Sequence, residues 1–327
     1  MSSTELKNII LAGATGSIGA PILTALLAQP SFNTTILSRT NSTATFPAHV
    51  PVTRVSPAFT VAELTAAFTG QDAVIVALSA VPVTQDASEA GLQYRLIDAA
   101  VAAGVKRFIP SEFGANNLDV RARSVVPVYD SKGCMLEYLT RKAEASGGKF
   151  TFTSISCGSW IDWALSAPQS SNFLSIDVAA RRATIYDSGT SRFSATLLPH
   201  TGLAVARALS PLHCAATANT QIFLSDFVAS ARSIVAALEK ASGDTFAVEQ
   251  RDSAPVLAAL RQRFDQGDKA AGFELLVCSF AADVDLGYDF EGRYEIWNAR
   301  LGLPTVTLDE VARQAVEVAD RGASART

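Results

Sequence analysis

The sequence predicts an α/β fold in which a doubly wound parallel sheet is followed by a smaller α+β portion. In the first half of the 327 residues, short apolar runs alternate with amphipathic helical stretches, which is the pattern of a parallel sheet covered on both faces. Three evenly spaced glycines separate the first apolar run from the first helical stretch. The alternation loosens after residue 157, so we place one domain at 1–157 and a smaller portion packed against it at 158–327.

Six strands are expected in the first half, because each is a short apolar run of the kind that buried parallel strands show. They are residues 8–12, 34–38, 50–55, 72–78, 106–110 and 150–155. Helices are expected from the last glycine of the loop to about residue 30, and over 61–68, 88–103 and 127–146. Ligands of such sheets bind beyond the carboxyl ends of the strands, so the loops that begin near Ser79 and Ser111 are candidate binding loops.

The second half predicts a mixture of short strands and helices. Strands are expected at 183–186, 193–196 and 221–224, and helices at 202–209, 226–240, 254–264 and 308–320. Ser225 and Asp226 are suitable caps for the second of these helices. Because no long linker separates the halves, we expect a cleft between them.

The glycines lie in the segment Gly13-Ala-Thr-Gly-Ser-Ile-Gly19, directly after the first strand and before the first helix. Glycines allow a tight turn and a close approach of the backbone to a pyrophosphate, which the amides and partial positive charge of a helix N-terminus then bind. The position at the start of a βαβ pattern predicts a Rossmann-type dinucleotide site. Its candidate residues are Gly13, Thr15, Gly16, Ser17, Ile18 and Gly19.

Arg39 follows the second strand, where NAD-selective proteins of this fold usually place Asp or Glu on the ribose 2′-hydroxyl. A guanidinium can instead hold a 2′-phosphate through paired charged hydrogen bonds. No acidic residue occurs between Thr34 and Ala48, so the expected cofactor is NADPH/NADP+.

Lys132 lies on the apolar stripe of the predicted helix 127–146, in line with Val128 and Leu136. An inward lysine has a lowered pKa and can serve as an acid or base. It can also hold ribose hydroxyls only, or extend to water from the first turn. Tyr129, three residues earlier, is a second candidate and ranks below Lys132 acting alone.

Composition excludes several classes of protein. The net charge of −4 and the lack of a basic run argue against a nucleic-acid binder. The most apolar stretch, 73–83, is too short to span a membrane, and the polar N-terminus does not resemble a secretory signal. The four scattered cysteines and three histidines show no metal-ligand spacing. We therefore expect a cytoplasmic protein without a metal.

The glycine loop, Arg39 and the string Val105-Lys-Arg-Phe-Ile-Pro-Ser-Glu-Phe-Gly114 resemble the NmrA-like family, which includes the isoflavone reductase-like enzymes. The resemblance implies an NADPH-dependent reductase with Lys132 as general acid/base and with Ser111, Glu112 and Phe113 beside the nicotinamide. Two departures from the plant-type pattern stand out: segment 40–48 has no second basic residue, and Leu136 replaces an arginine. The expected substrate is therefore a small aromatic or hydrophobic molecule other than the plant one, and a homodimer is allowed.

Trp160 and Trp163 follow the sixth strand and are candidates for a substrate wall, although core packing explains them equally well. Phe280, Tyr288, Tyr294 and Trp297 are assigned to packing. Two other functions stay open. One is a non-catalytic NAD(P) redox sensor of the NmrA type that acts through a protein partner. The other is a sugar-nucleotide epimerase or dehydratase, against which the absence of Tyr-x-x-x-Lys counts.

Overall fold

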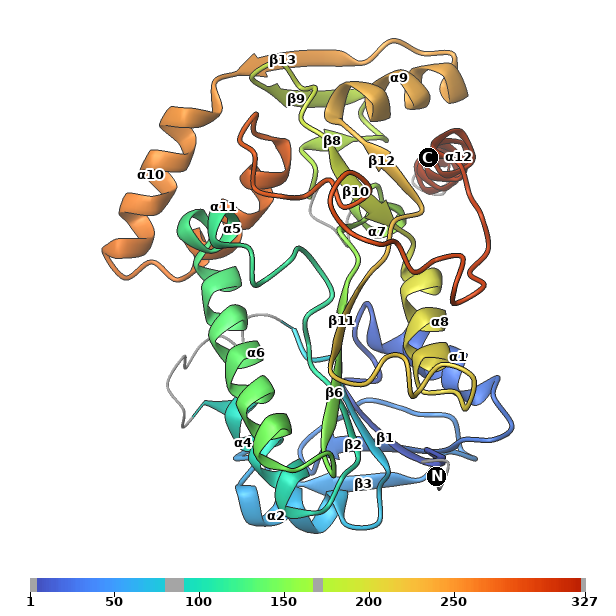
Figure 1. The fold of residues 1–327 in the computed structure, drawn as a ribbon. Helices are drawn as coiled ribbons and strands as arrows, with labels where there is room; N and C mark the ends of the chain where they lie inside the picture. The colour runs from blue at the N-terminus through green and yellow to red at the C-terminus, as the bar shows by residue number, and fades with distance from the viewer. Residues whose placement is uncertain (1–4, 80–90, 167–172, 325–327) are drawn as a thin grey trace.

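A computed structural model describes residues 5–79, 91–166 and 173–324 of the chain. Its centre is a seven-stranded sheet of order β11-β6-β5-β4-β1-β2-β3, in which every neighbouring pair is parallel (Figure 1). The strands are β1 (Asn8–Ala12), β2 (Asn33–Arg39), β3 (Val52–Val55), β4 (Ala73–Val76), β5 (Arg107–Ile109), β6 (Thr151–Ser156) and β11 (Thr220–Phe223). The doubly wound parallel sheet expected from the sequence is confirmed.

Helices cover both faces of this sheet (Figure 1). On one face lie α1 (Gly19–Leu27) and α8 (Leu198–Ala208), and on the other lie α2 (Val61–Phe68), α4 (Leu92–Ala102) and α6 (Pro127–Ala145). Because the strands are buried on both sides, their side chains alternate between two separate apolar cores. Ile9 and Leu11 of β1 join the α1 side, whereas Ile10 and Ala12 join the α2 side.

The sheet takes one strand and one covering helix from beyond residue 157. Strand β11 pairs with β6, with Thr220 opposite Thr153 and Phe223 opposite Ser156, and α8 packs along α1. The division at 157/158 stays a prediction, but the sheet itself extends across it.

The remaining elements form the smaller portion above the carboxyl ends of the sheet (Figure 1). Two three-stranded sheets, β12-β10-β7 and β13-β9-β8, share a third apolar core with helices from the same portion. Their strands are β7 (Ser159–Trp160), β8 (Ile176–Asp177), β9 (Arg182–Tyr186), β10 (Phe193–Thr196), β12 (Phe227–Ala229) and β13 (Ala247–Arg251). The other helices of this portion are α7 (Ile161–Ala164), α9 (Ala231–Ser242), α10 (Ser253–Asp265), α11 (Ala270–Ala281) and α12 (Leu308–Ser324). Helix α5 (Val120–Val125) belongs to the first half of the chain and packs against α6.

The predicted first-half strands agree with the structure within two residues at each end, and α2 agrees at both ends. The helix predicted at 226–240 was wrong at its start, because 227–229 form β12 and the helix begins at Ala231. Its cap is Ser230, whose side chain accepts from the Ser233 amide in a capping box, so the cap predicted at Ser225 and Asp226 was wrong. Residues 88–90 of the predicted helix 88–103 lie outside the described residues.

Candidate functional site

A cavity of about 340 Å³ lies where the carboxyl ends of the sheet meet α6 and α11. The loops that follow β1, β4, β5 and β6 supply its floor, and the smaller portion supplies its far wall. Sequence-predicted residues form much of the floor, namely Gly16, Ser17, Ile18, Ser79, Ser111, Phe113 and Lys132. Gly13, Thr15 and Gly19 belong to the same glycine loop without lining the cavity.

The glycine loop is tight enough to exclude side chains at two positions. Gly13 has a φ of +90°, and a Cβ there would lie 2.3 Å from the Ala77 carbonyl oxygen at the end of β4. A Cβ on Gly19 would lie 1.9 Å from the Gly13 carbonyl oxygen. The loop can therefore pass directly from β1 into α1 only with glycine at these positions.

The start of α1 presents free backbone donors. Its N-cap residue, Ile18, provides no side-chain cap. Within the part of the chain that the structure describes, the amides of Ser17, Ile18 and Gly19 donate to no protein group. Unpartnered amides at a helix N-terminus bind anions, so these residues fit the pyrophosphate of a dinucleotide.

The loops after β4 and β5 hold each other in place. The Ser111 hydroxyl donates to the Leu78 carbonyl oxygen at 2.6 Å. Phe113 has a φ of +38°, which is unusual for a residue with a side chain, and its amide donates to the Ile155 carbonyl oxygen at 3.0 Å. These bonds fix the backbone that turns Ser111, Glu112 and Phe113 toward the cavity.

Lys132 reaches the cavity from the first turns of α6. Its Nζ donates to the Glu112 carbonyl oxygen at 2.6 Å, so the side chain points inward, as its place on the apolar stripe predicts. Burial lowers the pKa of Lys132, while the nearby Glu112 carboxyl opposes that shift. The result is a half-buried amine that is held against the loop after β5 and is easier to deprotonate than an exposed lysine.

Glu112 is the one buried carboxyl among the described lining residues, with a side chain only 1 % exposed. Its Oε2 accepts a hydrogen bond from Asn117 Nδ2 at 2.5 Å, whereas Oε1 has no partner among the described residues. Burial raises the pKa of Glu112 to about 7, against the opposing effects of Lys132 and Asn117. The family resemblance alone predicted Glu112 beside the nicotinamide, and no pattern in the sequence indicated its burial.

Tyr129 does not form a hydrogen bond with Lys132 in the described structure. Its ring is 3 % exposed and contacts the ring of Tyr288 edge-on at 6.2 Å. Burial, together with Tyr288, raises the pKa of the Tyr129 phenol well above its ordinary value. Tyr129 therefore stays protonated, and it both lines the cavity and packs α6 against the smaller portion.

Aromatic rings make up the far wall of the cavity. Trp160 and Trp163 meet edge-on at 6.3 Å, and Trp163 continues to Phe173 at 5.4 Å. Helix α11 then adds Phe273 and Phe280. The assignment of Phe280 to packing alone was incomplete, because it also lines the cavity. Helix α11 was not predicted from the sequence, because its residues are apolar nearly all round.

Arg39 lies at the end of β2, exposed and outside the cavity lining. A second arginine, Arg54 of β3, donates from Nη1 to the Arg39 carbonyl oxygen at 3.0 Å. The loop after Arg39, residues 40–48, contains no further basic residue. The pairing of β2 with β3 brings Arg54 next to the end of β2, where Arg39 lies.

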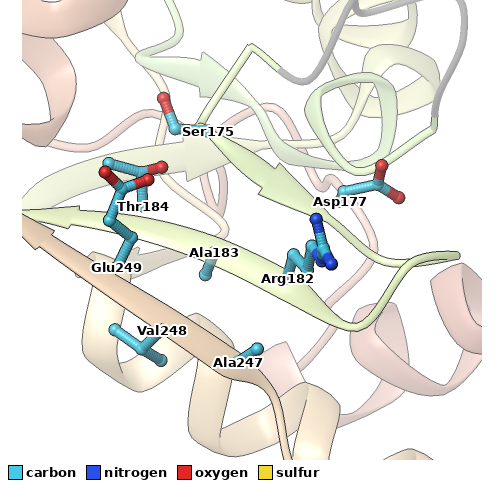
Figure 2. A pocket seen from close by; sticks show the side chains of 8 residues that line it. All are labelled: Ser175, Asp177, Arg182, Ala183, Thr184, Ala247, Val248 and Glu249. Atoms are coloured by element: carbon cyan, nitrogen blue, oxygen red, sulfur yellow. The ribbon is translucent and has the colours of Figure 1, made fainter.

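A second hollow lies over the small sheet β13-β9-β8 (Figure 2). It lies within the smaller portion and shares no lining residue with the aromatic cavity. Its lining residues are Ser175, Asp177, Arg182, Ala183, Thr184, Ala247, Val248 and Glu249. Neither hollow is accompanied by a cluster of three potential metal ligands within the described ranges.

Comparison with known proteins identifies the family. Residues 13–162 match a family model described as NAD(P)H-binding. The chain is 32% identical over 313 residues to Oxidoreductase poxI of Penicillium oxalicum, which covers 94% of this chain and 93% of that protein. It is also 32% identical over 304 residues to Oxidoreductase aprR of Aspergillus flavus, covering 93% and 96% of the two chains. The chain belongs to this NAD(P)H-binding oxidoreductase family.

Solved structures of this fold extend the comparison. The crystal structure of isoflavone reductase matches with a TM-score of 0.68 and 19% identity, covering 94% of this chain and 99% of that one. The structure of AtPrR2 with NADP+ and (+)pinoresinol matches with a TM-score of 0.67 and 19% identity, covering 95% of this chain and 99% of that one. The NADPH-dependent quinone oxidoreductase QOR2 of Escherichia coli, complexed with NADPH, matches with a TM-score of 0.67 and 21% identity. The match covers 94% of this chain and 99% of that one.

The resemblance drawn from the glycine loop, Arg39 and Val105–Gly114 is thus confirmed. A nicotinamide cofactor and an oxidoreductase activity follow from the family. In the described ranges, no helix combines the length and apolarity that a membrane crossing requires.

Proposed function

We propose that this oxidoreductase is an NADPH-dependent reductase of a small aromatic or hydrophobic substrate, with Lys132 as its general acid/base. One observation carries the proposal. The amides at the start of α1, the Lys132 amine and an aromatic wall surround a single cavity. The aromatic rings offer a flat apolar surface for a ring-bearing ligand. The structure with NADP+ and (+)pinoresinol supports a ligand of this class.

The residues present fit the cofactor. The unpartnered amides of Ser17 and Ile18 would hold its pyrophosphate, and Arg39 would hold its 2′-phosphate. Ser79, Ser111 and Phe113 would border the nicotinamide end, since they line the cavity beyond the glycine loop. When bound, the cofactor supplies a hydride.

Lys132 supplies the proton that hydride addition to a polar double bond requires. Its Nζ is anchored to the Glu112 carbonyl oxygen, which leaves its other hydrogens free to face the cavity. The lowered pKa makes proton release easier than from an exposed lysine. The buried Glu112 and the apolar wall limit water around the amine.

The test is consumption of NADPH against a panel of aromatic ketones, quinones and aryl ethers, with Lys132→Ala and Lys132→Arg. For a substrate that is turned over, we expect Lys132→Ala to lower kcat by about 10²–10⁴-fold and to leave NADPH affinity within a few-fold. Lys149→Ala, at an exposed lysine after α6, serves as control. Unchanged turnover in Lys132→Ala overturns the role of Lys132. NADPH binding without turnover of any compound, together with a stoichiometric protein partner, favours the redox sensor.

All four cysteines are free thiols. Reduced cysteines are usual in cytosolic proteins, and this supports our further proposal that the protein acts in the cytoplasm.

A further inference from the structure

Arg54 lies against the turn that carries Arg39. Strands β2 and β3 pair in parallel with Ser38 opposite Arg54 and Arg39 opposite Val55. The Arg39 carbonyl oxygen accepts the Ser42 amide at 3.1 Å and Arg54 Nη1 at 3.0 Å. Arg54 therefore places its guanidinium at the carboxyl end of β2, although 15 residues separate it from Arg39.

The surroundings of both arginines lack negative charge. No Asp or Glu occurs between Glu5 and Glu63, although the chain has 31 acidic residues. In the described structure, neither Arg39 nor Arg54 forms an ion pair, although most of the ion pairs found elsewhere in the molecule involve arginine. Both are exposed. Two unneutralised guanidinium groups therefore share one end of the sheet, next to the loop that precedes α1.

A phosphomonoester matches this arrangement. It carries a charge of about −1.5 to −2 at pH 7, so a single guanidinium leaves much of that charge without a partner. Arg54 has five N–H donors, of which one is bonded to the Arg39 carbonyl oxygen. The others are available for an anion held over the turn.

We propose that Arg54 is the second cation for the 2′-phosphate of NADPH and acts from β3 beside Arg39 of β2. The inference rests on the NADPH preference proposed above. It assigns cofactor selectivity to a pair of neighbouring strands, in place of one strand and its following loop.

Bracing of the turn is the competing role for Arg54. A brace would support the ribose of NADPH and of NADH alike, since both dinucleotides pass the same turn. A cation for the 2′-phosphate would affect only ligands that carry this group. Adenosine 2′,5′-bisphosphate and adenosine 5′-monophosphate differ in this group alone and need no catalysis, so they separate the two roles.

The experiment measures the Kd of both nucleotides, and of NADPH and NADH, by calorimetry with the full chain. Arg54→Gln removes the charge and keeps a donor for the Arg39 carbonyl oxygen, whereas Arg54→Lys keeps the charge. Arg39→Gln is the positive comparison, and Lys149→Gln is the control for loss of one exposed cation. We expect Arg54→Gln to raise the Kd of adenosine 2′,5′-bisphosphate and of NADPH about tenfold. The Kd values of adenosine 5′-monophosphate and NADH should stay within about twofold of those of the unmodified protein. Arg54→Lys should retain most of the selectivity.

Equal weakening of all four ligands by Arg54→Gln shows bracing and overturns the proposal. The proposal is also overturned if Arg54→Gln binds all four ligands as the unmodified protein does while Arg39→Gln binds only the 2′-phosphorylated ligands more weakly. In that case the preference for NADPH stands. If the unmodified protein binds NADPH and NADH equally, the preference itself fails. A smaller salt dependence of NADPH affinity in Arg54→Gln, with that of NADH unchanged, supports direct contact with the phosphate.

Discussion

Glu112 is buried at the base of the cavity, where one carboxyl oxygen accepts a hydrogen bond and the other has no partner among the residues that the structure describes. A buried carboxylate is costly in free energy unless its charge is compensated. Lys132 compensates only in part, since its hydrogen bond goes to the Glu112 backbone. The pKa of about 7 means that Glu112 gains or loses its proton near neutral pH, and the net charge of Glu112 and Lys132 at the cavity then changes.

This pKa makes stability depend on pH. An unfolded Glu112 titrates near its ordinary value of 4.5. Between that pH and about 7 the folded protein keeps a proton on Glu112 that the unfolded chain has lost. The free energy of unfolding is therefore higher at low pH and falls as the pH rises through this window. We expect Glu112→Gln to remove part of the fall, on the order of 1–3 kcal/mol. Urea unfolding at pH 5 and pH 8 measures it.

Glu144→Gln, at an exposed position on α6, is the matched control and should keep the pH dependence of the unmodified chain. If the free energy of unfolding of Glu112→Gln changes between pH 5 and pH 8 by as much as that of the unmodified chain, Glu112 is ionised in both the folded and the unfolded chain across this range.

Sequence could anticipate some of these residues and not others. Lys132 was predictable because helical spacing alone places it on the stripe of Val128 and Leu136. Arg54 was not, because its place beside Arg39 depends on the pairing of two strands. The unpartnered oxygen of Glu112 depends on the loop after β5, where Phe113 takes a backbone conformation that no local pattern announces.

At the scale of elements, the crossing of α1 and α8 positions the glycine loop. The two helices pack closely at Gly202, where a Cβ would lie 2.6 Å from the backbone of Pro21. Pro21 is in the first turn of α1, next to the amides that would hold the pyrophosphate. A residue of the second half thus controls the placement of the N-terminus of α1.

We expect Gly202→Ala to lower the free energy of unfolding by about 1–3 kcal/mol through overpacking and to weaken NADPH binding. Alanine favours helix over glycine by about 1 kcal/mol, so any net loss comes from the crossing. Chemical denaturation and a fluorescence titration measure both effects. Gly292→Ala is the control, since an added Cβ there meets nothing within 4 Å. Wild-type stability in Gly202→Ala would show that α8 can move without cost.

The elements that escaped prediction share a physical reason. Helix α11 is apolar on most sides because it packs between α10, α6 and the aromatic wall, and so it lacks the polar face that marks a surface helix. Phe227–Ala229 continues the apolar run of the following helix, and only the capping box at Ser230 separates β12 from α9. All five residues of β13 are exposed, so no alternation marks that strand.

At the scale of the whole molecule, the cavity is formed only because both halves contribute to it. The first half supplies the glycine loop and Lys132, and α11 of the second half supplies Phe273 and Phe280. The strongly predicted part of the candidate site is therefore the glycine-loop end. The aromatic wall depends on packing between distant segments and was predictable only through Trp160 and Trp163, which follow β6.

Because the sheet and its covering helices draw on both halves, we expect residues 1–157 to be an incomplete folding unit. Without the remainder, β6 loses its pairing with β11, and the α1 side of the sheet loses buried side chains such as Val205, Ile222 and Trp297. We expect the fragment 1–157 to be insoluble, or to show no cooperative thermal transition by circular dichroism, whereas the full chain shows one. Cooperative melting and NADPH binding by the fragment would instead show that the sheet is stable with β6 as its edge, and that 157/158 is a true domain boundary.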